Sequence, residues 1–333
     1  MNTGSAPSEF DLIRSIARHV KASDAVPIGI GDDAAVISPT PHQHLVTTTD
    51  SLVLDRHFTS DWRAKDIGHL AMAVNLSDLA AMAAYPRWAL LNLTLPKNSS
   101  YATQAWLDDF VQGFLSVDDG VTLVGGNLSE GPLNIGVVLI GEVAPGQAIT
   151  RRGASVGDAL VVTGSLGDAA TALRLALDNK PVHQALQARL RRPTPRVLAG
   201  QHAAKHVHAM IDISDGLLAD LSHLLDASSD TRTPLGAQIQ LDALPTSEAL
   251  QTLHLPDADR WNLQLSGGND YELLMSVPPS KVDALLDDLQ SARTPASVIG
   301  QVTAEPTVKL LDPRGDEFVP VRQGWDHFQE AMT

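Results

Sequence analysis

The sequence predicts a two-domain protein of mixed α/β or α+β architecture. Its 333 residues exceed the usual length of a single domain. β-Branched apolar runs alternate with helical patterns along the whole chain, and this alternation is typical of layered α/β folds. We place the boundary near Pro145, which gives an N-terminal domain of residues 1–145 and a C-terminal domain of residues 146–333.

Composition and charge narrow the class of protein. No run approaches the ~18 apolar residues of a membrane span, and the N-terminus, with Glu9 and Asp11, does not resemble a signal peptide. The absence of cysteine excludes disulfides, thiolate metal sites and thiol nucleophiles, and it fits a cytoplasmic bacterial-type enzyme. A net charge of -15 predicts a uniformly acidic surface, with no nucleic-acid or membrane partner. An anionic substrate can still bind if divalent cations bridge it to carboxylates.

The N-terminal domain is predicted to begin with an amphipathic helix over residues 9–20, which Ser8 caps. An acidic stretch with two glycines follows, Gly29-Ile30-Gly31-Asp32-Asp33-Ala34-Ala35-Val36. Its glycines allow a turn or a close backbone approach, and its last residues predict a strand that enters a core. An Asp pair in an apolar stretch is costly unless a cation or several donors neutralise it. The alternative is an acidic turn in solvent.

A strand over residues 45–50 is predicted to deliver Asp50 to its C-terminal edge. Thr48 and Thr49 add hydroxyl or carbonyl oxygens beside that carboxylate. An ordinary strand followed by an Asp-Ser turn is the alternative.

Residues 64–84 form the clearest predicted helix, and its small, apolar composition predicts burial. Asn75 and Asp78 lie three residues apart and therefore share a face. A carboxylate in such a helix needs a partner, which is either a hydrogen-bond donor in the core or a metal ion.

The remaining N-terminal elements are predicted as a strand over 87–95, a helix over 102–117, and strands over 121–124 and 135–143. Gly125-Gly126-Asn127 follows the third of these as a predicted turn. A Gly-Gly turn after a strand suits close approach of backbone N–H groups to phosphate, although such turns are also common without a ligand.

The C-terminal domain is predicted to contain strands over 159–163, 208–213, 237–241, 273–277, 297–302 and 308–311, with helical segments over 166–206, 217–225, 246–265 and 281–291. An acidic turn, Asp212-Ile213-Ser214-Asp215-Gly216, precedes the helix that starts at residue 217. Carboxylates and a hydroxyl beside a helix N-terminus suit an ion and phosphate site, whereas Asp215 would also serve as a plain helix cap.

Two further segments carry polar groups of the same kind. Arg151 and Arg152 are clustered near the acidic motifs, and guanidinium groups suit phosphate, although a solvated pair is the alternative. A second Gly-Gly turn, Ser266-Gly267-Gly268-Asn269-Asp270, leads toward the strand over 273–277.

The carboxylates at Asp33, Asp50, Asp78, Asp212 and Asp215 would repel one another if left bare. Oxygen-rich sites of this kind suit Mg²⁺, which bridges one or two carboxylates to substrate phosphates. The sequence has no P-loop, protein-kinase motif, Rossmann GxGxxG or HExxH zinc motif. It therefore predicts metal-assisted phosphoryl transfer by positioning and charge neutralisation, and no residue stands out as a general base.

Several motifs together resemble the thiamine-monophosphate kinase family of the aminoimidazole-ribonucleotide synthetase superfamily. They are GIGDDAAV, TTDSLV, AVNLSDLAAM, LVGGN, RRGASVGD, IDISDGLLADL, SGGNDYEL and GWDHF, in that order. The resemblance implies transfer of the ATP γ-phosphoryl group to thiamine phosphate with Mg²⁺, giving thiamine diphosphate. It also implies a mixed-sheet N-terminal domain that forms a homodimer, a C-terminal α/β sandwich, and active sites in clefts between domains and subunits.

The resemblance also assigns roles to individual residues. The magnesium ligands it implies are Asp33, Thr48, Thr49, Asp50, Asp78, Asn127, Asp212 and Asp215. The nucleotide-contacting residues it implies are Gly126, Asn127, Arg151 and Ser214. The thiamine phosphate contacts it implies are His57, Asn269 and Trp325. The alternatives are a polar core residue for His57 and a C-terminal packing anchor for Trp325 and Phe328.

Two positions depart from the family pattern, because Asn127 and Asn269 stand where relatives commonly carry an acid. An Asn offers a carbonyl oxygen but no charge. Two alternatives therefore remain beside the kinase: another ATP-using member of the superfamily, such as an aminoimidazole-ribonucleotide synthetase-like enzyme, and a non-catalytic nucleotide- or magnesium-binding protein.

Overall fold

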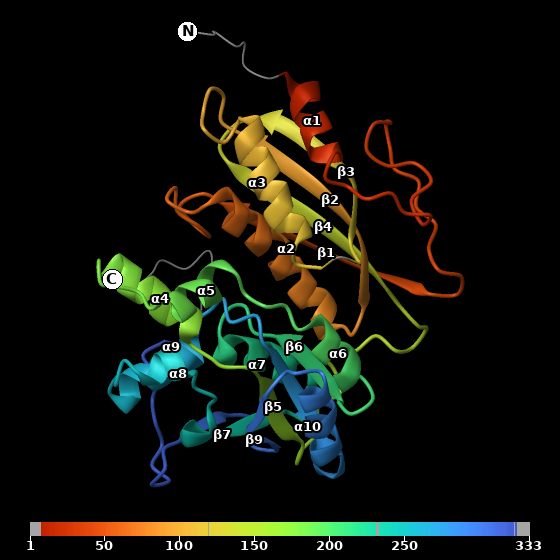
Figure 1. Cartoon of the computed structure of the whole chain (residues 1–333). Coiled ribbons are helices and arrows are strands. Elements are labelled where there is room, and N and C mark those ends of the chain that lie inside the picture. The colour runs from red at the N-terminus through yellow and green to blue at the C-terminus, as the bar shows by residue number, and fades with distance from the viewer. Residues whose placement is uncertain (1–7, 119, 231–232, 323, 325–333) are drawn as a thin grey trace. The chain divides into compact units, whose positions relative to one another are not determined.

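A computed structural model describes residues 8–118, 120–230, 233–322 and 324. The chain divides into two compact units, and Figure 1 colours them by residue number. The first comprises Met1–Leu79 and Ala84–Gly146, and the second comprises Ala80–Ala83 and Gln147–Thr333. No helix in the described part of the chain is long and apolar enough to cross a membrane.

The first unit is a four-stranded mixed sheet with three helices. In spatial order its strands are β1 (His44–Val53), β4 (Asn134–Val143), β2 (Tyr85–Leu95) and β3 (Thr122–Glu130). Among the strands of this sheet that the structure describes, the β2–β3 pair is parallel and the other two pairs are antiparallel. The helices are α1 (Glu9–Ala17), α2 (Ala64–Ala81) and α3 (Gln104–Leu115).

Alternation along the strands buries one face of this sheet. Leu91, Leu93 and Ile135 are buried, whereas their strand neighbours turn toward the other face. Helices α2 and α3 pack tightly side by side (Figure 1). A Cβ on Gly68 would lie 2.0 Å from the carbonyl oxygen of Phe110, so these helix backbones touch. The predicted burial of the first long helix is confirmed, since nearly every α2 side chain is buried.

The second unit is built on a six-stranded mixed sheet. In spatial order its strands are β10 (Val308–Leu311), β7 (Gly236–Gln240), β9 (Ala296–Thr303), β5 (Ala159–Thr163), β8 (Leu273–Val277) and β6 (Ala209–Asp212). Its α-helices are α4 (Asp168–Leu177), α5 (Gln184–Arg191), α6 (Val197–Ala203), α7 (Leu217–Ser228), α8 (Glu248–Gln251), α9 (Asp257–Ser266) and α10 (Val282–Ser291). Two short 3₁₀ helices cover Leu241–Ala243 and Pro279–Lys281.

Both faces of this second sheet are covered by apolar side chains. Leu160 and Val162 of β5 join a core cluster with α7 and α9, whereas the intervening Val161 joins another cluster with α6 and α10. The central strands β5 and β8 are therefore mostly apolar on both faces, as expected for a sheet buried on both sides.

Three expectations about local structure are wrong. The stretch over residues 29–36 does not enter a core: it forms isolated bridges, and its flanking Ile28 and Val36 are 41% and 46% exposed. Strand β1 continues to Val53, so Asp50 lies within the strand and not at its end. Gly125-Gly126-Asn127 is not a turn, because β3 runs through it to Glu130.

Candidate functional site

In the first unit, the predicted magnesium ligands of β1 and α2 meet on one face of the sheet. The Thr48 hydroxyl donates a hydrogen bond to Asp78 Oδ2 at 2.5 Å. Asp50 lies two residues after Thr48 and therefore on the same face of β1. These are hard oxygen donors from two different elements, the type of ligand that Mg²⁺ prefers.

Two neighbouring polar residues do not join that group through their side chains. Thr49 points to the opposite face, and its hydroxyl donates to the carbonyl oxygen of Val137 at 2.8 Å. Asn75 is fully buried, and its amide donates to the Ala71 carbonyl of its own helix at 2.9 Å. Thr49 would therefore reach a cation on the Thr48 face only through backbone oxygen, and Asn75 serves the core.

The acidic turn, defined as residues 29–33, is open to solvent. Asp32 and Asp33 are both exposed. The Asp33 amide donates to Asp32 Oδ1 at 2.8 Å, so Asp32 shapes the turn while the Asp33 carboxylate faces outward. Burial does not force this Asp pair to find a partner, in contrast to the cost expected for an apolar stretch.

Gly126 and Asn127 lie on β3, the edge strand of the first sheet. Gly126 has φ +155°, and a Cβ there would lie 1.9 Å from the Leu91 carbonyl oxygen. The β2–β3 register also shifts between Ala89 and Leu90. Glycine is therefore required by close strand packing at a bulge, and Asn127 beside it is exposed.

His57 lies in the turn that follows β1. Its Nδ1 accepts a hydrogen bond from the Val53 amide at 3.0 Å. An imidazole nitrogen that accepts carries no proton, so the neutral ring holds its proton on Nε2. His57 is half-buried.

In the second unit, the segment between β6 and α7 forms an acidic loop, defined as residues 212–216. Asp212 ends β6 and is 4% exposed, while Ser214 and Asp215 are half-buried. The backbone N–H groups of Ser214, Asp215 and Gly216 donate to a single carboxylate oxygen, Asp220 Oδ2, at 3.0, 3.1 and 3.2 Å.

Asp220 was not among the predicted site residues. Burial, followed by the negative charge of Asp215, raises the pKa of Asp220 to about 7, although the three backbone hydrogen bonds oppose the shift. The sequence signal that could have indicated it is an acid one helical turn after Gly216.

The second Gly-Gly segment packs directly against the acidic loop. The Asn269 amide donates to the Ser214 carbonyl at 2.8 Å, and the Tyr271 amide donates to the Ile213 carbonyl at 2.8 Å. Asn269 is exposed, and its Oδ1 accepts from the Tyr271 hydroxyl at 3.1 Å. The structure thus brings together Ser214 and Asn269, which lie 55 residues apart in the sequence.

A buried ionic network lies behind these two loops. Glu272 is fully buried and accepts hydrogen bonds from Arg189 at 2.7 Å, from Arg196 at 2.6 and 2.7 Å, and from the Thr163 hydroxyl at 2.7 Å. The Glu272 carboxylate raises the pKa of Arg196 against the opposing effect of burial. Sequence reasoning missed this network, because its members are more than 70 residues from Glu272.

Asp270 lies at the edge of the same network and is 1% exposed. Its Oδ1 accepts from the Gly167 amide at 2.9 Å, and its Oδ2 has no hydrogen-bond partner among the described residues. Burial raises the pKa of Asp270 well above its usual value. Arg189 and the Gly167 amide oppose this shift, and the charges of Glu272 and Asp168 add to it.

Two other predicted site residues of the second unit, Arg151 and Trp325, have no described side-chain contact with the acidic loop. Arg151 is exposed, and its carbonyl accepts from Ser228 Oγ at 2.9 Å, which anchors it at the C-terminal end of α7. Trp325 and Phe328 lie outside the described residues. A Cβ on Gly324 would lie 3.3 Å from the Asp215 carbonyl oxygen, so the chain reaches the acidic loop one residue before Trp325.

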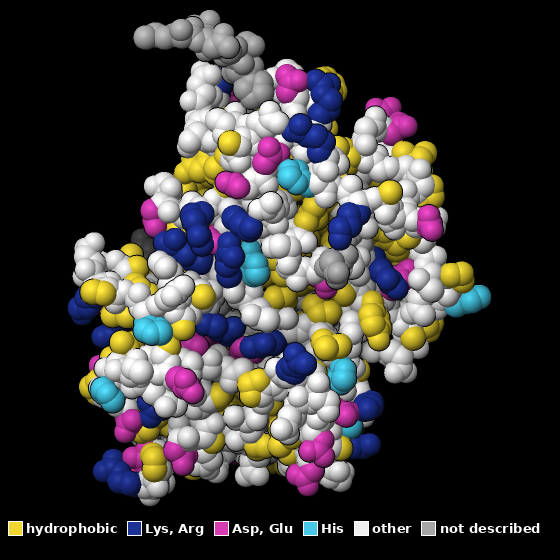
Figure 2. All heavy atoms as spheres, viewed as in Figure 1, with side chains coloured by type: hydrophobic (Ala, Val, Ile, Leu, Met, Phe, Trp, Pro, Cys, Tyr) yellow, Lys and Arg dark blue, Asp and Glu magenta, His cyan; other side chains and the backbone are white. Residues whose placement is uncertain are grey.

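Charge on the surface is mixed, contrary to the expectation of a uniformly acidic surface. Figure 2 shows Lys and Arg side chains interspersed with acidic side chains over the face in view. An anionic ligand therefore does not meet uniform repulsion despite the net charge of -15.

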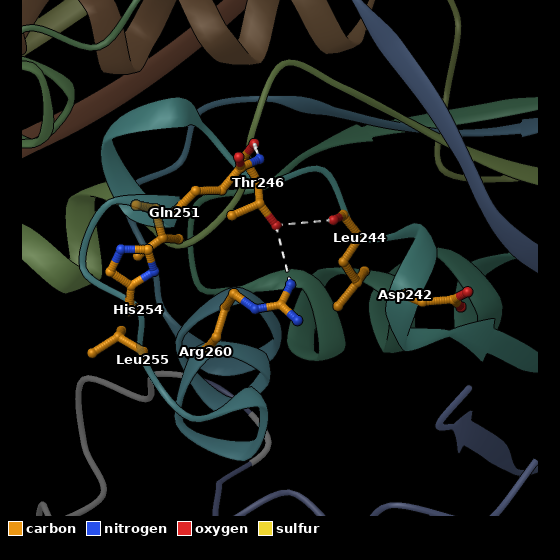
Figure 3. Close-up of a pocket in the computed structure, with 8 residues that line it drawn as sticks. Asp242, Leu244, Thr246, Gln251, His254, Leu255 and Arg260 are labelled. Carbon is orange, nitrogen blue, oxygen red and sulfur yellow. Dashed lines mark hydrogen bonds between the residues drawn. The ribbon is translucent and has the colours of Figure 1, made fainter. Parts of the chain in front are cut away.

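A pocket of about 450 Å³ lies in the second unit and is lined by none of the predicted site residues (Figure 3). Three of its polar side chains, those of Thr246, Gln251 and Arg260, form hydrogen bonds within the pocket or with nearby residues. Arg260 donates to Thr246 Oγ1 at 3.2 Å and to Asp257 at 2.7 Å, and Gln251 donates to the Thr246 carbonyl at 3.1 Å. It is therefore not part of the candidate site.

Comparison with known proteins defines the class. Two family models match in order: AIR synthase related protein, N-terminal domain, over residues 31–143, and AIR synthase related protein, C-terminal domain, over residues 155–312. These matches and the two mixed sheets confirm the expected fold of the aminoimidazole-ribonucleotide synthetase type.

Individual relatives narrow the class further. The chain is 39% identical to the thiamine-monophosphate kinase of Escherichia coli (strain K12), over 97% of this chain and 99% of that protein. A thiamine-monophosphate kinase structure from Stenotrophomonas maltophilia K279a has a TM-score of 0.80 at 39% identity, covering 90% of this chain and 94% of that chain. AaThiL complexed with AMPPCP and TMP has a TM-score of 0.72 at 31% identity, covering 96% and 97%. The chain belongs to the thiamine-monophosphate kinase family.

Proposed function

We propose that this protein transfers the γ-phosphoryl group of ATP to thiamine phosphate, giving thiamine diphosphate and ADP. The observation that carries the proposal is the near full-length similarity to thiamine-monophosphate kinases, at 39% identity over 97% of the chain. A related structure with AMPPCP, a methylene-bridged ATP analogue, and TMP supports ATP as co-substrate and thiamine phosphate as acceptor.

The oxygen donors of the first unit suit a magnesium ion. Asp33, Thr48, Asp50 and Asp78 would hold it, with Thr49 contributing backbone oxygen and Asn127 contributing its amide carbonyl oxygen. No group of three or more His, Cys, Asp or Glu with metal-binding geometry occurs among the described residues. Mg²⁺ usually keeps several waters, and phosphate oxygens of the substrate complete its shell. In the second unit, Asp212 and Asp215 would hold magnesium through their carboxylates.

The remaining site residues would orient the two phosphate compounds. We assign Gly126, Asn127, Arg151 and Ser214 to the nucleotide, and His57, Asn269 and Trp325 to thiamine phosphate. The packing of Asn269 on Ser214 supports the assignment of both loops to one function. His57, with its proton on Nε2, would donate a hydrogen bond to an anionic oxygen of the substrate.

The reaction needs no general base. The attacking atom is an oxygen of a phosphate that is already anionic, so a bond forms from it to the γ-phosphorus while the bond to the β–γ bridging oxygen breaks. Mg²⁺, when bound, neutralises charge on the transferred group. The side chains of the protein hold the two phosphates in line, exclude water and position the acceptor. A chiral γ-phosphate should therefore be transferred with inversion, whereas retention or an isolated phospho-enzyme would contradict direct transfer.

The first unit also supports a homodimer. The sheet face opposite the buried side chains carries partly exposed apolar residues, among them Leu45 and Tyr85, which are 49% and 54% exposed. A second copy would cover this face. We assign the activity to the cytoplasm, where ATP is present.

The decisive assay mixes the purified protein with ATP, MgCl₂ and thiamine phosphate and measures thiamine diphosphate. The Asp50→Ala variant should lose turnover, whereas Asp24→Ala, a change of an exposed acid in the first unit, should retain it. ATP binding without product would favour the non-catalytic alternative that Asn127 and Asn269 suggest. Near-normal activity of Asp50→Ala would overturn the metal assignment.

A further inference from the structure

Asp220 stands out because one carboxylate oxygen organises the whole acidic loop. Its Oδ2 accepts the N–H groups of Ser214, Asp215 and Gly216, three consecutive residues, at 3.0–3.2 Å. Asp220 is 3% exposed. It lies in the first turn of α7, where a negative charge is favourable near the helix N-terminus.

This arrangement changes what the N-terminus of α7 can bind. The free N–H groups at a helix start ordinarily form a site for phosphate or another anion. Here the three preceding N–H groups already point at an internal anion. They cannot at the same time point outward at a phosphate, so the loop groups that remain for a ligand are the side-chain oxygens of Ser214 and Asp215.

The opposite side of the loop is fixed as well. The Ser214 and Ile213 carbonyls accept N–H groups of Asn269 and Tyr271, both at 2.8 Å. Gly216 has φ +115°, and a Cβ there would lie 3.0 Å from the Ser266 carbonyl carbon. The loop backbone is therefore held between an internal carboxylate and the Gly-Gly segment, and few conformations remain for Ser214 and Asp215.

We propose that Asp220 is a positioning residue which makes this loop a receptor for the magnesium ion of a magnesium–nucleotide complex rather than for bare phosphate. Asp220 touches neither ligand. It acts by occupying the loop amides and by aiming the oxygens of Ser214 and Asp215 outward. This inference rests on the proposed function for the identity of the nucleotide, but not on turnover.

The test compares AMPPCP binding to the full-length protein by calorimetry, with and without Mg²⁺. Asp220→Ala should weaken Mg²⁺–AMPPCP binding about 10- to 100-fold, the usual cost of removing a group that orients a metal ligand. Binding of AMPPCP in EDTA should change less than about threefold or become tighter, because three N–H groups are released. Asp226→Ala, an exposed acid on the same helix, is the matched control and should leave both constants unchanged.

Asp220→Asn separates positioning from direct contact. The Asn carbonyl oxygen can accept the same N–H groups, so this variant should recover most of the magnesium-dependent affinity. If Asp220→Ala does not fold, Asp220→Asn carries the test through the amide hydrogen exchange of residues 214–216, which should stay slow and should match the wild-type rates.

Two outcomes would overturn the proposal: wild-type Mg²⁺–AMPPCP affinity in Asp220→Ala, or an Asp220→Asn variant that folds yet binds as poorly as Asp220→Ala. The second outcome would make Asp220 a direct ligand. An assay of the wild-type protein separates this inference from the proposed function. A failure to form thiamine diphosphate would contradict the kinase proposal. The calorimetric comparison would still decide the role of Asp220.

Discussion

The acidic turn of the first unit and the acidic loop of the second have similar sequences but different structures. Both combine Asp residues with glycine and a small or apolar neighbour. In the acidic turn, Asp33 is exposed and the local order comes from one amide bond to Asp32 and isolated bridges. In the acidic loop, three amides converge on Asp220, and the backbone is also paired with residues 269–272.

The difference shows that a short acidic motif does not encode its own rigidity. The acidic loop is preorganised by groups outside the motif, whereas the acidic turn is not held in this way within the described chain. Binding a ligand at the acidic turn should therefore carry a larger ordering cost than binding one at the acidic loop. Substitutions that disturb the acidic loop should therefore lower the free energy of unfolding, whereas substitutions in the acidic turn should lower activity.

The largest expected effect is a loss of stability when the buried ionic network around Glu272, which lies behind the acidic loop, is broken. Glu272→Ala should lower the free energy of unfolding by about 3–5 kcal/mol, because it leaves two mostly buried guanidinium groups without their carboxylate. The side chains of Arg189 and Arg196 are only 18% and 15% exposed. Urea denaturation monitored by circular dichroism measures the change.

A matched control is Glu305→Ala, which removes an exposed partner of Lys309. Its effect should stay below about 1 kcal/mol, as is usual for surface ion pairs. Equal losses in the two variants would show that the buried network does not stabilise the second unit, and the contrast between the loop and the turn would weaken.

The next effect concerns the acidic turn and should appear in activity alone. Asp33→Ala should reduce kcat/KM about 100-fold, in the range found when a group around a metal is removed. Its free energy of unfolding should change by less than about 0.5 kcal/mol, because the side chain is exposed and buries nothing. Asp24→Ala, another exposed acid of the first unit, is the control and should retain activity. A destabilised Asp33→Ala variant would show that the turn is preorganised after all.

Regular elements were predicted well from the sequence where the side-chain pattern is local. The strands over 159–163, 273–277 and 308–311 are confirmed with the same bounds, because each is a short apolar run between clear turn residues. The family and the fold type are also confirmed, since the eight motifs span nearly the whole chain.

The features that the sequence did not predict depend on contacts between residues that are distant in the sequence or on backbone geometry, which no local pattern reveals. The two glycines at 125–126 lie inside β3 because of a close approach to Leu91, which only strand pairing creates. Glu272 finds its partners 76–109 residues away. Asp220 lies only four residues from Gly216, but its role follows from the positive φ of that glycine, which turns the loop amides inward. The roles of individual site residues stay predictions.

A smaller effect should appear as a pH dependence of stability. Burial raises the pKa of Asp270 in the folded state, so the fold favours its protonated form. This contribution to stability is complete below the unfolded pKa of about 4 and is lost as the pH rises through the folded pKa. The free energy of unfolding should therefore fall with rising pH more steeply in the wild type than in Asp270→Asn, by about 1.4 kcal/mol for each unit of pKa difference.

Urea titrations at a series of pH values from 4 to 9 measure both slopes. Asp257→Asn is the control, because its exposed side chain should leave the wild-type slope unchanged. Parallel curves for the wild type and Asp270→Asn would mean that Asp270 ionises normally, and that the segment behind the acidic loop is less buried than the structure shows.

The smallest effect should come from the other carboxylate of the acidic turn. Asp32→Asn keeps an oxygen that can accept the Asp33 amide, so the turn should persist and kcat/KM should stay within about threefold of the wild type. Asp32→Ala removes that acceptor and should cost about 0.5–1.5 kcal/mol at most, since the released amide can bond to water. Steady-state kinetics and urea denaturation on the same preparations check both. A loss in Asp32→Asn as large as that in Asp33→Ala would mean that both carboxylates bind the cation. The resemblance between the turn and the acidic loop would then be limited to their sequences, because in the loop a separate acid, Asp220, holds the backbone.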